Sequence, residues 1–137
     1  HVTVLKKPLL GICLGMQMLG LSSEEGSLPG LGFIPFKSVK FQLDPGLKLK
    51  IPHMGWDVVR LAKAHPVLSN LQAHPRYYFV HSYHAVCDDE NDVLLWCDYG
   101  YPFAAAVQKD NVIGFQFHPE KSHQFGMTLL KNFAEGR

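Results

Sequence analysis

A cysteine flanked by glycines, at the junction of two apolar segments, constrains this chain most. Residues 9–12 form an apolar run that ends at Cys13, and the segment after it is apolar and compatible with a helix. A strand that turns sharply into a helix at such a pattern presents the cysteine as a nucleophile on an elbow. Gly11 and Gly15 lack the side chains that would crowd so tight a turn. We therefore expect an α/β fold arranged around this strand and helix.

The place of Cys13 predicts a reactive thiol. Free N–H groups and the dipole at a helix N-terminus favour the thiolate, which should lower the pKa of the cysteine. The N–H of Leu14, the next residue, should point to where an oxyanion would form. A lone cysteine is more often a buried structural residue, but the flanking glycines favour a nucleophile here.

A second segment supplies a candidate base. Residues 112–117 read as a buried strand that leads into His118, Pro119 and Glu120. Open α/β sheets gather their chemistry at the carboxyl edge of parallel strands, so His118 can face Cys13 there. Glu120 could bond the far ring nitrogen of His118 and fix its tautomer. A His-x-Glu pattern alone usually means a surface ion pair; with the elbow, it predicts a catalytic triad.

Composition limits the class of protein. The 137 residues, 47% of them hydrophobic and 18% charged, suit one domain over 1–137 with a buried core. A net charge of +1 gives no reason to invoke nucleic acid or an anionic membrane surface. No apolar run approaches the roughly 18 residues of a membrane span, and no signal peptide opens the chain. Three cysteines without close spacing argue against a disulfide framework and indicate a reducing, cytoplasmic location.

No metal or cofactor is expected. The chain has no Cys-x-x-Cys or His-Glu-x-x-His pattern. His81 and His84 should point to opposite faces of one strand.

Local patterns predict the remaining elements. They are a nucleophile helix over about 14–21, a loop over 22–31, a hairpin of 39–43 and 47–51 around Asp44-Pro45-Gly46, an irregular connection over 65–75, strands over 77–86, 92–97 and 103–107, a turn at 109–111, and a final helix capped by Ser122. Residues 1–7 follow no cap or turn, so we expect an N-terminally truncated domain that starts at its nucleophile strand.

Two motifs resemble a known family. Residues 11–17 (Gly-Ile-Cys-Leu-Gly-Met-Gln) and 117–122 (Phe-His-Pro-Glu-Lys-Ser) are similar to the class I glutamine amidotransferases. Residues 52–56 (Pro-His-Met-Gly-Trp) and 78–83 (Tyr-Phe-Val-His-Ser-Tyr) narrow the resemblance to the HisH family, the glutaminase subunits of imidazole glycerol phosphate synthase. The resemblance implies a flavodoxin-like domain with a mixed central sheet and flanking helices. It also implies a preceding N-terminal part, whose glycine-rich loop supplies a second oxyanion donor.

The resemblance implies hydrolysis of glutamine to glutamate and ammonia. Cys13 would attack the carboxamide, His118 would protonate the departing ammonia and then activate water, and Glu120 would hold His118. The implied substrate contacts are the N–H of Leu14, the side chain of Gln17, and the backbone of Ser82 and Tyr83.

The resemblance also implies a heterodimer with the cyclase subunit HisF. Ammonia released into water near neutral pH becomes ammonium, which is not a nucleophile, so direct transfer to a partner has a physical reason. The implied interface residues are Met54, Trp56, Tyr78, His81 and Lys121, and we expect Lys121 to form a salt bridge across the interface.

Three other functions remain open. The first is an amidotransferase of another pathway, such as anthranilate, guanylate or pyridoxal phosphate synthesis, against which residues 53–56 argue. The second is a catalytically silent docking module, and the third a cysteine hydrolase acting on peptides or γ-glutamyl bonds.

Overall fold

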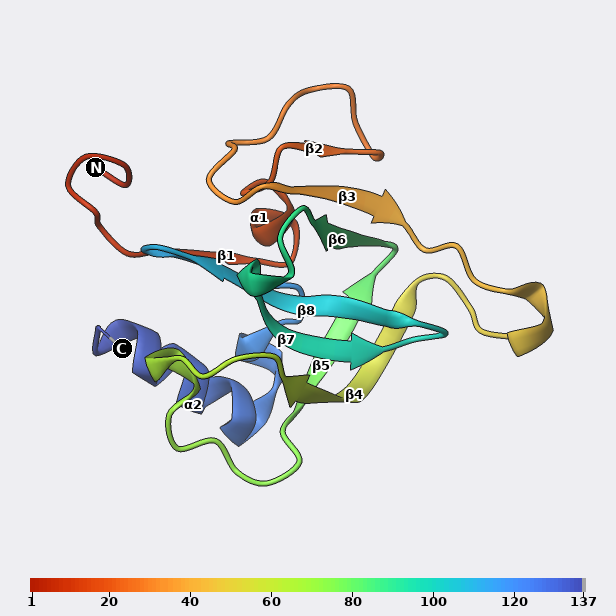
Figure 1. Cartoon of the computed structure of the whole chain (residues 1–137). Coiled ribbons are helices and arrows are strands. Elements are labelled where there is room, and N and C mark those ends of the chain that lie inside the picture. The colour runs from red at the N-terminus through yellow and green to blue at the C-terminus, as the bar shows by residue number, and fades with distance from the viewer. Residues whose placement is uncertain (137) are drawn as a thin grey trace.

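A curled β-sheet dominates the fold (Figure 1). The computed structural model describes residues 1–136. Its strands are β1 (Leu9–Ile12), β2 (Ser22–Ser23), β3 (Phe36–Lys40), β4 (His53–Leu61), β5 (Arg76–His81), β6 (Tyr83–Cys87), β7 (Val93–Asp98), β8 (Pro102–Lys109) and β9 (Val112–Phe115). The α-helices are α1 (Leu14–Gln17) and α2 (His123–Ala134), and short 3-10 turns are η1 (Pro45–Leu47), η2 (Pro66–Leu68), η3 (Glu90–Asp92) and η4 (Pro119–Lys121). Within these residues, neither helix is long and apolar enough to cross a bilayer.

The sheet is mixed. Strands β1 and β9 pair in parallel, as do β2 and β3, and the other pairings are antiparallel. The main path runs β2-β3-β6-β8-β7-β4-β5, and β9 joins it through β8. The predicted α/β class, with a mixed central sheet and flanking helices, is confirmed.

The two helices cover opposite faces of the sheet. Side chains alternate along a strand, and in β9 Val112 belongs to the cluster that holds Met16 of α1, whereas Ile113 and Phe115 belong to the cluster that holds Leu129 of α2. The elbow helix and the helix after His118 are thus fixed to the same strand from opposite sides.

The nucleophile strand lies where the sequence predicts it. Register runs from Leu9 opposite Val112 to Ile12 opposite Phe115. The N–H of Cys13 then donates to the carbonyl of Phe115 at 2.7 Å. Strand β1, which leads into Cys13, and strand β9, which leads toward His118, therefore end at the same level of the sheet.

Beyond β9 the chain bridges to β5, the last strand of the main path of the sheet. The N–H of His118 donates to the carbonyl of Tyr78 at 2.9 Å, an isolated bridge to β5. Because β5 stands at the far end of the strand order, this bridge brings that end of the sheet back to β9 and beside the elbow.

The helix after the elbow is shorter than predicted, Leu14–Gln17 rather than 14–21. Its end tightens, since the N–H groups of Leu19 and Gly20 bond carbonyls three residues back. The chain then meets β3, where the N–H of Leu21 donates to the Phe36 carbonyl at 2.8 Å and a Cβ on Gly20 would lie 2.5 Å from the Phe36 ring.

The predicted hairpin over 39–51 is wrong. The Asp44 side chain accepts from the N–H of Gly46 and opens η1, and Lys48 then adopts a left-handed conformation. Residues 48–51 form no strand, and β3 pairs with β6 instead. The segment extends beyond the sheet as an arm (Figure 1).

The other predicted elements are confirmed with small changes. The strand expected over 77–86 is two strands, β5 and β6, separated at Ser82. The loop over 22–31 contains the two-residue β2, and the connection over 65–75 contains η2. The turn at 109–111 joins β8 and β9 as an antiparallel pair.

Candidate active site

Cys13 occupies a strained elbow between β1 and α1. Its backbone φ of 54° and ψ of −110° are values that residues other than glycine rarely adopt. A Cβ on Gly11 would lie 2.6 Å from the Gly15 carbonyl oxygen, so this position must be glycine for the turn to close. A Cβ on Gly15 would meet nothing within 4 Å, so the expected crowding is absent there.

Burial raises the pKa of the Cys13 thiol, which corrects the expected lowering. The N–H of Leu14 lowers it, Glu120 raises it, Lys121 lowers it and Glu25 raises it, in decreasing order of effect. Because α1 has a single turn, its dipole is too short to outweigh desolvation. The charges of Glu120 and Lys121 nonetheless reach the thiol, so η4 lies close to it.

The predicted base and its orienting carboxylate are in contact. Nδ1 of His118 lies 3.1 Å from Oε2 of Glu120, with the His118 side chain 18% exposed and that of Glu120 48% exposed. Over residues 1–136, no hydrogen bond joins His118 to Cys13; the thiol instead faces the Val80 carbonyl at 3.8 Å. The segments that carry the three predicted triad residues thus lie close together. His118 is bonded to Glu120, but it is not bonded to Cys13 in this structure.

Ser122 fixes the backbone of His118, the predicted base. It precedes α2 as predicted, but its hydroxyl makes no capping bond to the helix. Its Oγ donates to the His118 carbonyl at 2.6 Å and accepts from the N–H of Tyr78 at 2.9 Å. Fully buried, Ser122 ties the turn after His118 to β5.

Two buried glutamines lie behind the thiol. Gln17 donates through Nε2 to the Tyr83 carbonyl and to Oε1 of Gln116, both at 3.2 Å. Nε2 of Gln116 lies 4.0 Å from the Cys13 sulfur. Gln116 is not among the predicted site residues, although a polar residue inside the apolar run 112–117 is a signal of a buried polar contact.

The Ser82–Tyr83 segment is bonded through its backbone. The Ser82 carbonyl accepts from the N–H of Phe41 at 3.1 Å. The Tyr83 carbonyl accepts from Gln17 and, at 2.8 Å, from Nδ1 of His81. The segment expected to contact substrate is therefore fixed to the nucleophile helix.

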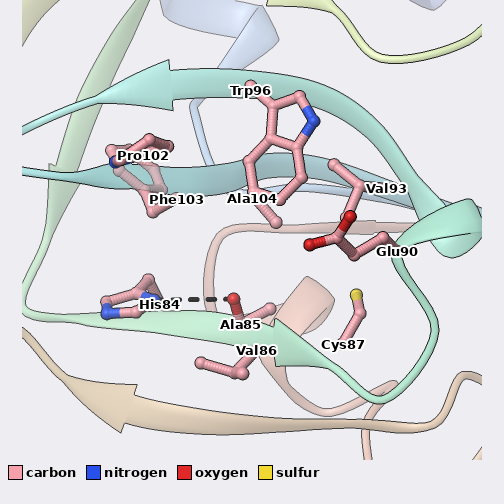
Figure 2. Close-up of a pocket in the computed structure, with 10 residues that line it drawn as sticks. All are labelled: His84, Ala85, Val86, Cys87, Glu90, Val93, Trp96, Pro102, Phe103 and Ala104. Carbon is pink, nitrogen blue, oxygen red and sulfur yellow. Dashed lines mark hydrogen bonds between the residues drawn. The ribbon is translucent and has the colours of Figure 1, made fainter.

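A hollow of about 350 Å³ opens beside α1, lined among others by Leu14, Gln17 and Glu25. Another pocket, of about 180 Å³, lies between β6 and β7–β8 (Figure 2). His84, Cys87 and Trp96 line it, and no member of the expected triad does. Cys13 itself lines neither of them, but Leu14, the residue that follows it, lines the hollow beside α1.

Four of the five expected interface residues are accessible. Met54 is 61% and Trp56 44% exposed on β4, Tyr78 is partly exposed, and Lys121 is exposed. The Trp56 ring stacks on His123 with centroids 5.5 Å apart. Within residues 1–136, Lys121 forms no ion pair.

The buried histidines differ from expectation. His81 is only 6% exposed, so its side chain lies behind the surface where contact with a partner was expected. His81 and His84 do not point to opposite faces, because the break at Ser82 brings both rings onto Phe41, at 5.1 and 4.8 Å. Separately, His53, Asp57 and Cys97 place possible ligand atoms within 4.8 Å of one another and could hold a metal ion.

A cysteine on a strand-to-helix elbow, with a histidine–glutamate pair at the end of the parallel neighbouring strand, is the set of groups that cysteine-dependent acyl transfer requires. The sequence matches the family "Glutamine amidotransferase class-I" over residues 1–136. The chain belongs to that family.

Curated relatives are closely similar in sequence. A protein named imidazole glycerol phosphate synthase subunit HisH 2 from Pseudomonas aeruginosa is 56% identical over 135 residues, covering 98% of this chain and 66% of the relative. A protein of the same name from Methanococcus maripaludis is 55% identical, covering 95% and 63%. The chain thus spans about two-thirds of the length of these relatives.

Solved structures share the fold. A putative GMP synthase protein from Thermoplasma acidophilum superposes with a TM-score of 0.65 at 21% identity, covering 93% of this chain and 56% of that chain. A glutamine amidotransferase from Thermotoga maritima gives 0.59 at 16% identity, covering 94% and 47%.

Proposed function

We propose that this chain provides the glutaminase centre of an imidazole glycerol phosphate synthase, releasing ammonia from glutamine for a cyclase subunit in histidine biosynthesis. The observation that carries the proposal is the in-register pairing of β1 and β9, which joins the Cys13 elbow to the strand that leads into His118 and Glu120. The high identity to relatives named HisH supports the choice of pathway. The three cysteines are free thiols, as in proteins of reducing compartments, so a cytoplasmic location forms part of the proposal.

The chemistry follows from the positions of three side chains. Cys13 attacks the carboxamide carbon and forms a tetrahedral oxyanion, to which the N–H of Leu14 donates. His118 accepts the thiol proton and gives it to the leaving ammonia, and it then activates the water that hydrolyses the thioester. Glu120 holds the ring through Nδ1, which leaves Nε2 for these transfers. Because burial raises the pKa of the thiol, proton transfer to His118 on substrate binding is the step that produces the nucleophile.

The hollow beside α1 suits the rest of the glutamine molecule. Leu14 and Gln17 line it, as expected of substrate contacts, and Glu25 adds a carboxylate whose charge reaches Cys13. A carboxylate there can pair with the α-ammonium group of glutamine. The Ser82–Tyr83 backbone, held by Gln17, would form the opposite wall.

The partner surface is the exposed side of β4 with its neighbours. Met54, Trp56 and Tyr78 give it apolar and aromatic contacts, and Lys121 gives it a cation. Aromatic anchors of this kind dominate the binding energy of many interfaces. Lys121 lies one residue after Glu120, so docking there would place the partner beside the site of ammonia release.

The test is glutamate release from glutamine by the intact protein. It should be measured alone, with the cyclase of an imidazole glycerol phosphate synthase, and with that cyclase plus its nucleotide ligand, using Cys13→Ala as the control. We expect release that depends on Cys13 and rises in the complex. Release that any other amidotransferase synthase stimulates equally would contradict the pathway, and activity retained by Cys13→Ala would contradict the mechanism.

A further inference from the structure

Three side chains of different ligand types meet at the end of the β4–β7 ladder. His53 and Asp57 lie on β4 and Cys97 on β7, and a ring nitrogen, a carboxylate oxygen and the thiol sulfur lie within 4.8 Å of one another. Nε2 of His53 is 3.0 Å from Oδ2 of Asp57. The two strands lie side by side (Figure 1), and the first pair of their ladder joins Val59 to Cys97. The cluster therefore lies next to the point where the two strands begin to pair.

A glycine makes room for the cluster. Side chains alternate across a strand, so those of His53 and Asp57 lie on one face, with Gly55 between them. Residues four apart on a strand are separated by roughly 13 Å along its axis. Gly55 has a φ of 124°, and a Cβ built on it would meet nothing within 4 Å, so the space above it is open. The imidazole and the carboxylate can therefore meet over this position.

The donor set suits Zn²⁺. Imidazole nitrogen, thiolate sulfur and carboxylate oxygen are its usual ligands, whereas Mg²⁺ and Ca²⁺ prefer oxygen alone. A tetrahedral ion with bonds of roughly 2.0–2.3 Å needs ligand atoms about 3.3–3.6 Å apart. The three ligand atoms are already within 4.8 Å of one another, so small side-chain rotations are enough.

The charges and the access also fit a divalent cation. A carboxylate and a thiolate balance the charge of Zn²⁺, so binding adds no net charge to a largely buried site. As the bond between zinc and sulfur forms, the Cys97 thiol releases its proton to solvent. The Asp57 side chain is 35% exposed, which leaves a path for the ion and a fourth position for water.

His81 supplies the neighbouring hydrogen-bond partner that metal-binding histidines require. Its Nε2 lies 3.0 Å from Nδ1 of His53, and its own Nδ1 lies 2.8 Å from the Tyr83 carbonyl oxygen. A histidine that binds a metal through one nitrogen usually donates its other N–H to a buried acceptor. His53 would bind the ion through Nε2 and donate through Nδ1 to His81, which donates in turn to the Tyr83 carbonyl. Two neutral rings supply the two N–H groups that these two contacts need, and the ion occupies the third contact, between His53 and Asp57.

We propose that His53, Asp57 and Cys97 form a Zn²⁺ site that links β4 to β7. The short sequence patterns of zinc sites predict no metal in this chain, because these ligands lie on separate strands far apart in the sequence. Cys13 is not a member of the group. The site is therefore independent of the function proposed above, and its test needs no glutaminase activity.

The direct test uses the intact protein with Cys97 as its single cysteine, obtained with Cys13→Ala and Cys87→Ser. Native mass spectrometry and competition with a chromogenic chelator should give one Zn²⁺ per chain. Co²⁺ in its place should show a thiolate-to-metal charge-transfer band, and X-ray absorption of the Zn²⁺ form should show one sulfur ligand. These measurements leave all three proposed ligands intact. A protein that binds no Zn²⁺, or binds it without a sulfur ligand, would overturn the proposal.

Single substitutions then test each ligand. In the same background, Cys97→Ser and Asp57→Asn should each weaken Zn²⁺ binding by more than the about 10–100-fold that loss of a neighbouring hydrogen-bond partner costs. Zn²⁺ should raise the midpoint of thermal unfolding of the parent but not of Cys97→Ser.

The matched control is Asp98→Asn. Asp98 follows Cys97 in the chain but pairs with Arg60 at 2.6 Å on the exposed surface. This variant should bind Zn²⁺ as tightly as the parent and show the same rise in the unfolding midpoint. Parent-like affinity in both Cys97→Ser and Asp57→Asn would overturn the assignment of ligands, and so would an equal loss in Asp98→Asn.

Discussion

The thiol of Cys13, the proposed nucleophile, is weakly reactive in the free protein. Its thiol is half-buried, its pKa is raised by that burial, and its proton faces the Val80 carbonyl rather than His118. Two neighbours in η4 act on it in opposite directions, because Glu120 raises the pKa and Lys121 lowers it. The free protein should therefore hold Cys13 mainly as the thiol, which reacts with electrophiles more slowly than the thiolate does.

This balance predicts the pH dependence of alkylation. Iodoacetamide reacts with the thiolate, so the rate at Cys13 should rise about tenfold per pH unit from pH 7 into the alkaline range. Glu120→Gln removes an influence that raises the pKa and should speed the reaction at pH 8, whereas Lys121→Ala should slow it. The measurement is the time course of carbamidomethylation by mass spectrometry of the intact protein and its peptides.

Internal controls come from the other thiols. Burial raises the pKa of Cys87 to about 12 and also raises that of Cys97, so both should stay unmodified at pH 8. Glu25→Gln should act like Glu120→Gln but more weakly. A rate at Cys13 that is already maximal at pH 6 would mean a preformed thiolate–imidazolium pair and would contradict this account.

At the scale of the element, the elbow depends on one of its two glycines. Gly11→Ala forces a Cβ to 2.6 Å from the Gly15 carbonyl, against backbone that cannot move aside, and should destabilise the fold by about 1–3 kcal/mol. Gly15→Ala meets open space inside a helix and should leave stability unchanged or raise it by up to about 1 kcal/mol. Urea unfolding followed by circular dichroism measures both variants.

The pair of variants also separates folding from chemistry. If Gly15→Ala folds well but loses glutamine hydrolysis, the open space beside it belongs to the substrate or to a further segment of the protein. Equal destabilisation by both variants would contradict the close approach of β1 to α1.

Strands and helices whose ends are set by neighbouring residues could be predicted from the sequence. Those that depend on pairing or packing with distant residues could not. The strand into Cys13, the strand into His118 and the final helix follow from apolar runs with clear ends. The hairpin over 39–51 failed because β3 finds its partner in β6 rather than in the next segment. The nucleophile helix ends early because the chain after it bonds to β3, where the N–H of Leu21 donates to the Phe36 carbonyl.

The same division holds for the candidate site. The types and order of Cys13, His118 and Glu120 were predictable from motifs, but the direction of the thiol pKa was not, because burial depends on the whole fold. The approach of His81 to His53 across β4 and β5 has no local signal. Gln116 did carry a local signal, because it is a polar residue in an apolar segment. Its hydrogen bond with Gln17 explains why a polar side chain is buried there.

At the scale of the whole molecule, the exposed side of β4 is connected through packed side chains to the proposed catalytic residues. Trp56 contacts Tyr78 and His123, and Tyr78 in turn pairs with His118 across the closing bridge of the sheet. A partner that binds this surface would rest directly on the strand that supports the base.

This arrangement predicts separate effects on binding and on folding. Trp56→Ala should weaken cyclase binding by at least about 2 kcal/mol, as expected of a central aromatic anchor, without lowering the midpoint of urea unfolding. Lys121→Ala should weaken binding less and reduce its dependence on salt. Isothermal titration calorimetry at two salt concentrations measures both effects.

Val86→Ala is the matched control, since Val86 is 50% exposed on β6, away from this surface. It should leave cyclase affinity unchanged. Unaltered affinity in both Trp56→Ala and Lys121→Ala would place the partner elsewhere on the molecule.

The pairing of β1 with β9 has a consequence for the way the protein is made. Within residues 1–136, β9 is the only strand that holds β1, and the ribosome adds it about a hundred residues after the cysteine. While those residues are added, the nascent chain carries its thiol with neither the elbow nor the histidine–glutamate pair in place. The proposed glutaminase centre is therefore assembled only after β9 has been added, and chains that end before β9 should hydrolyse no glutamine.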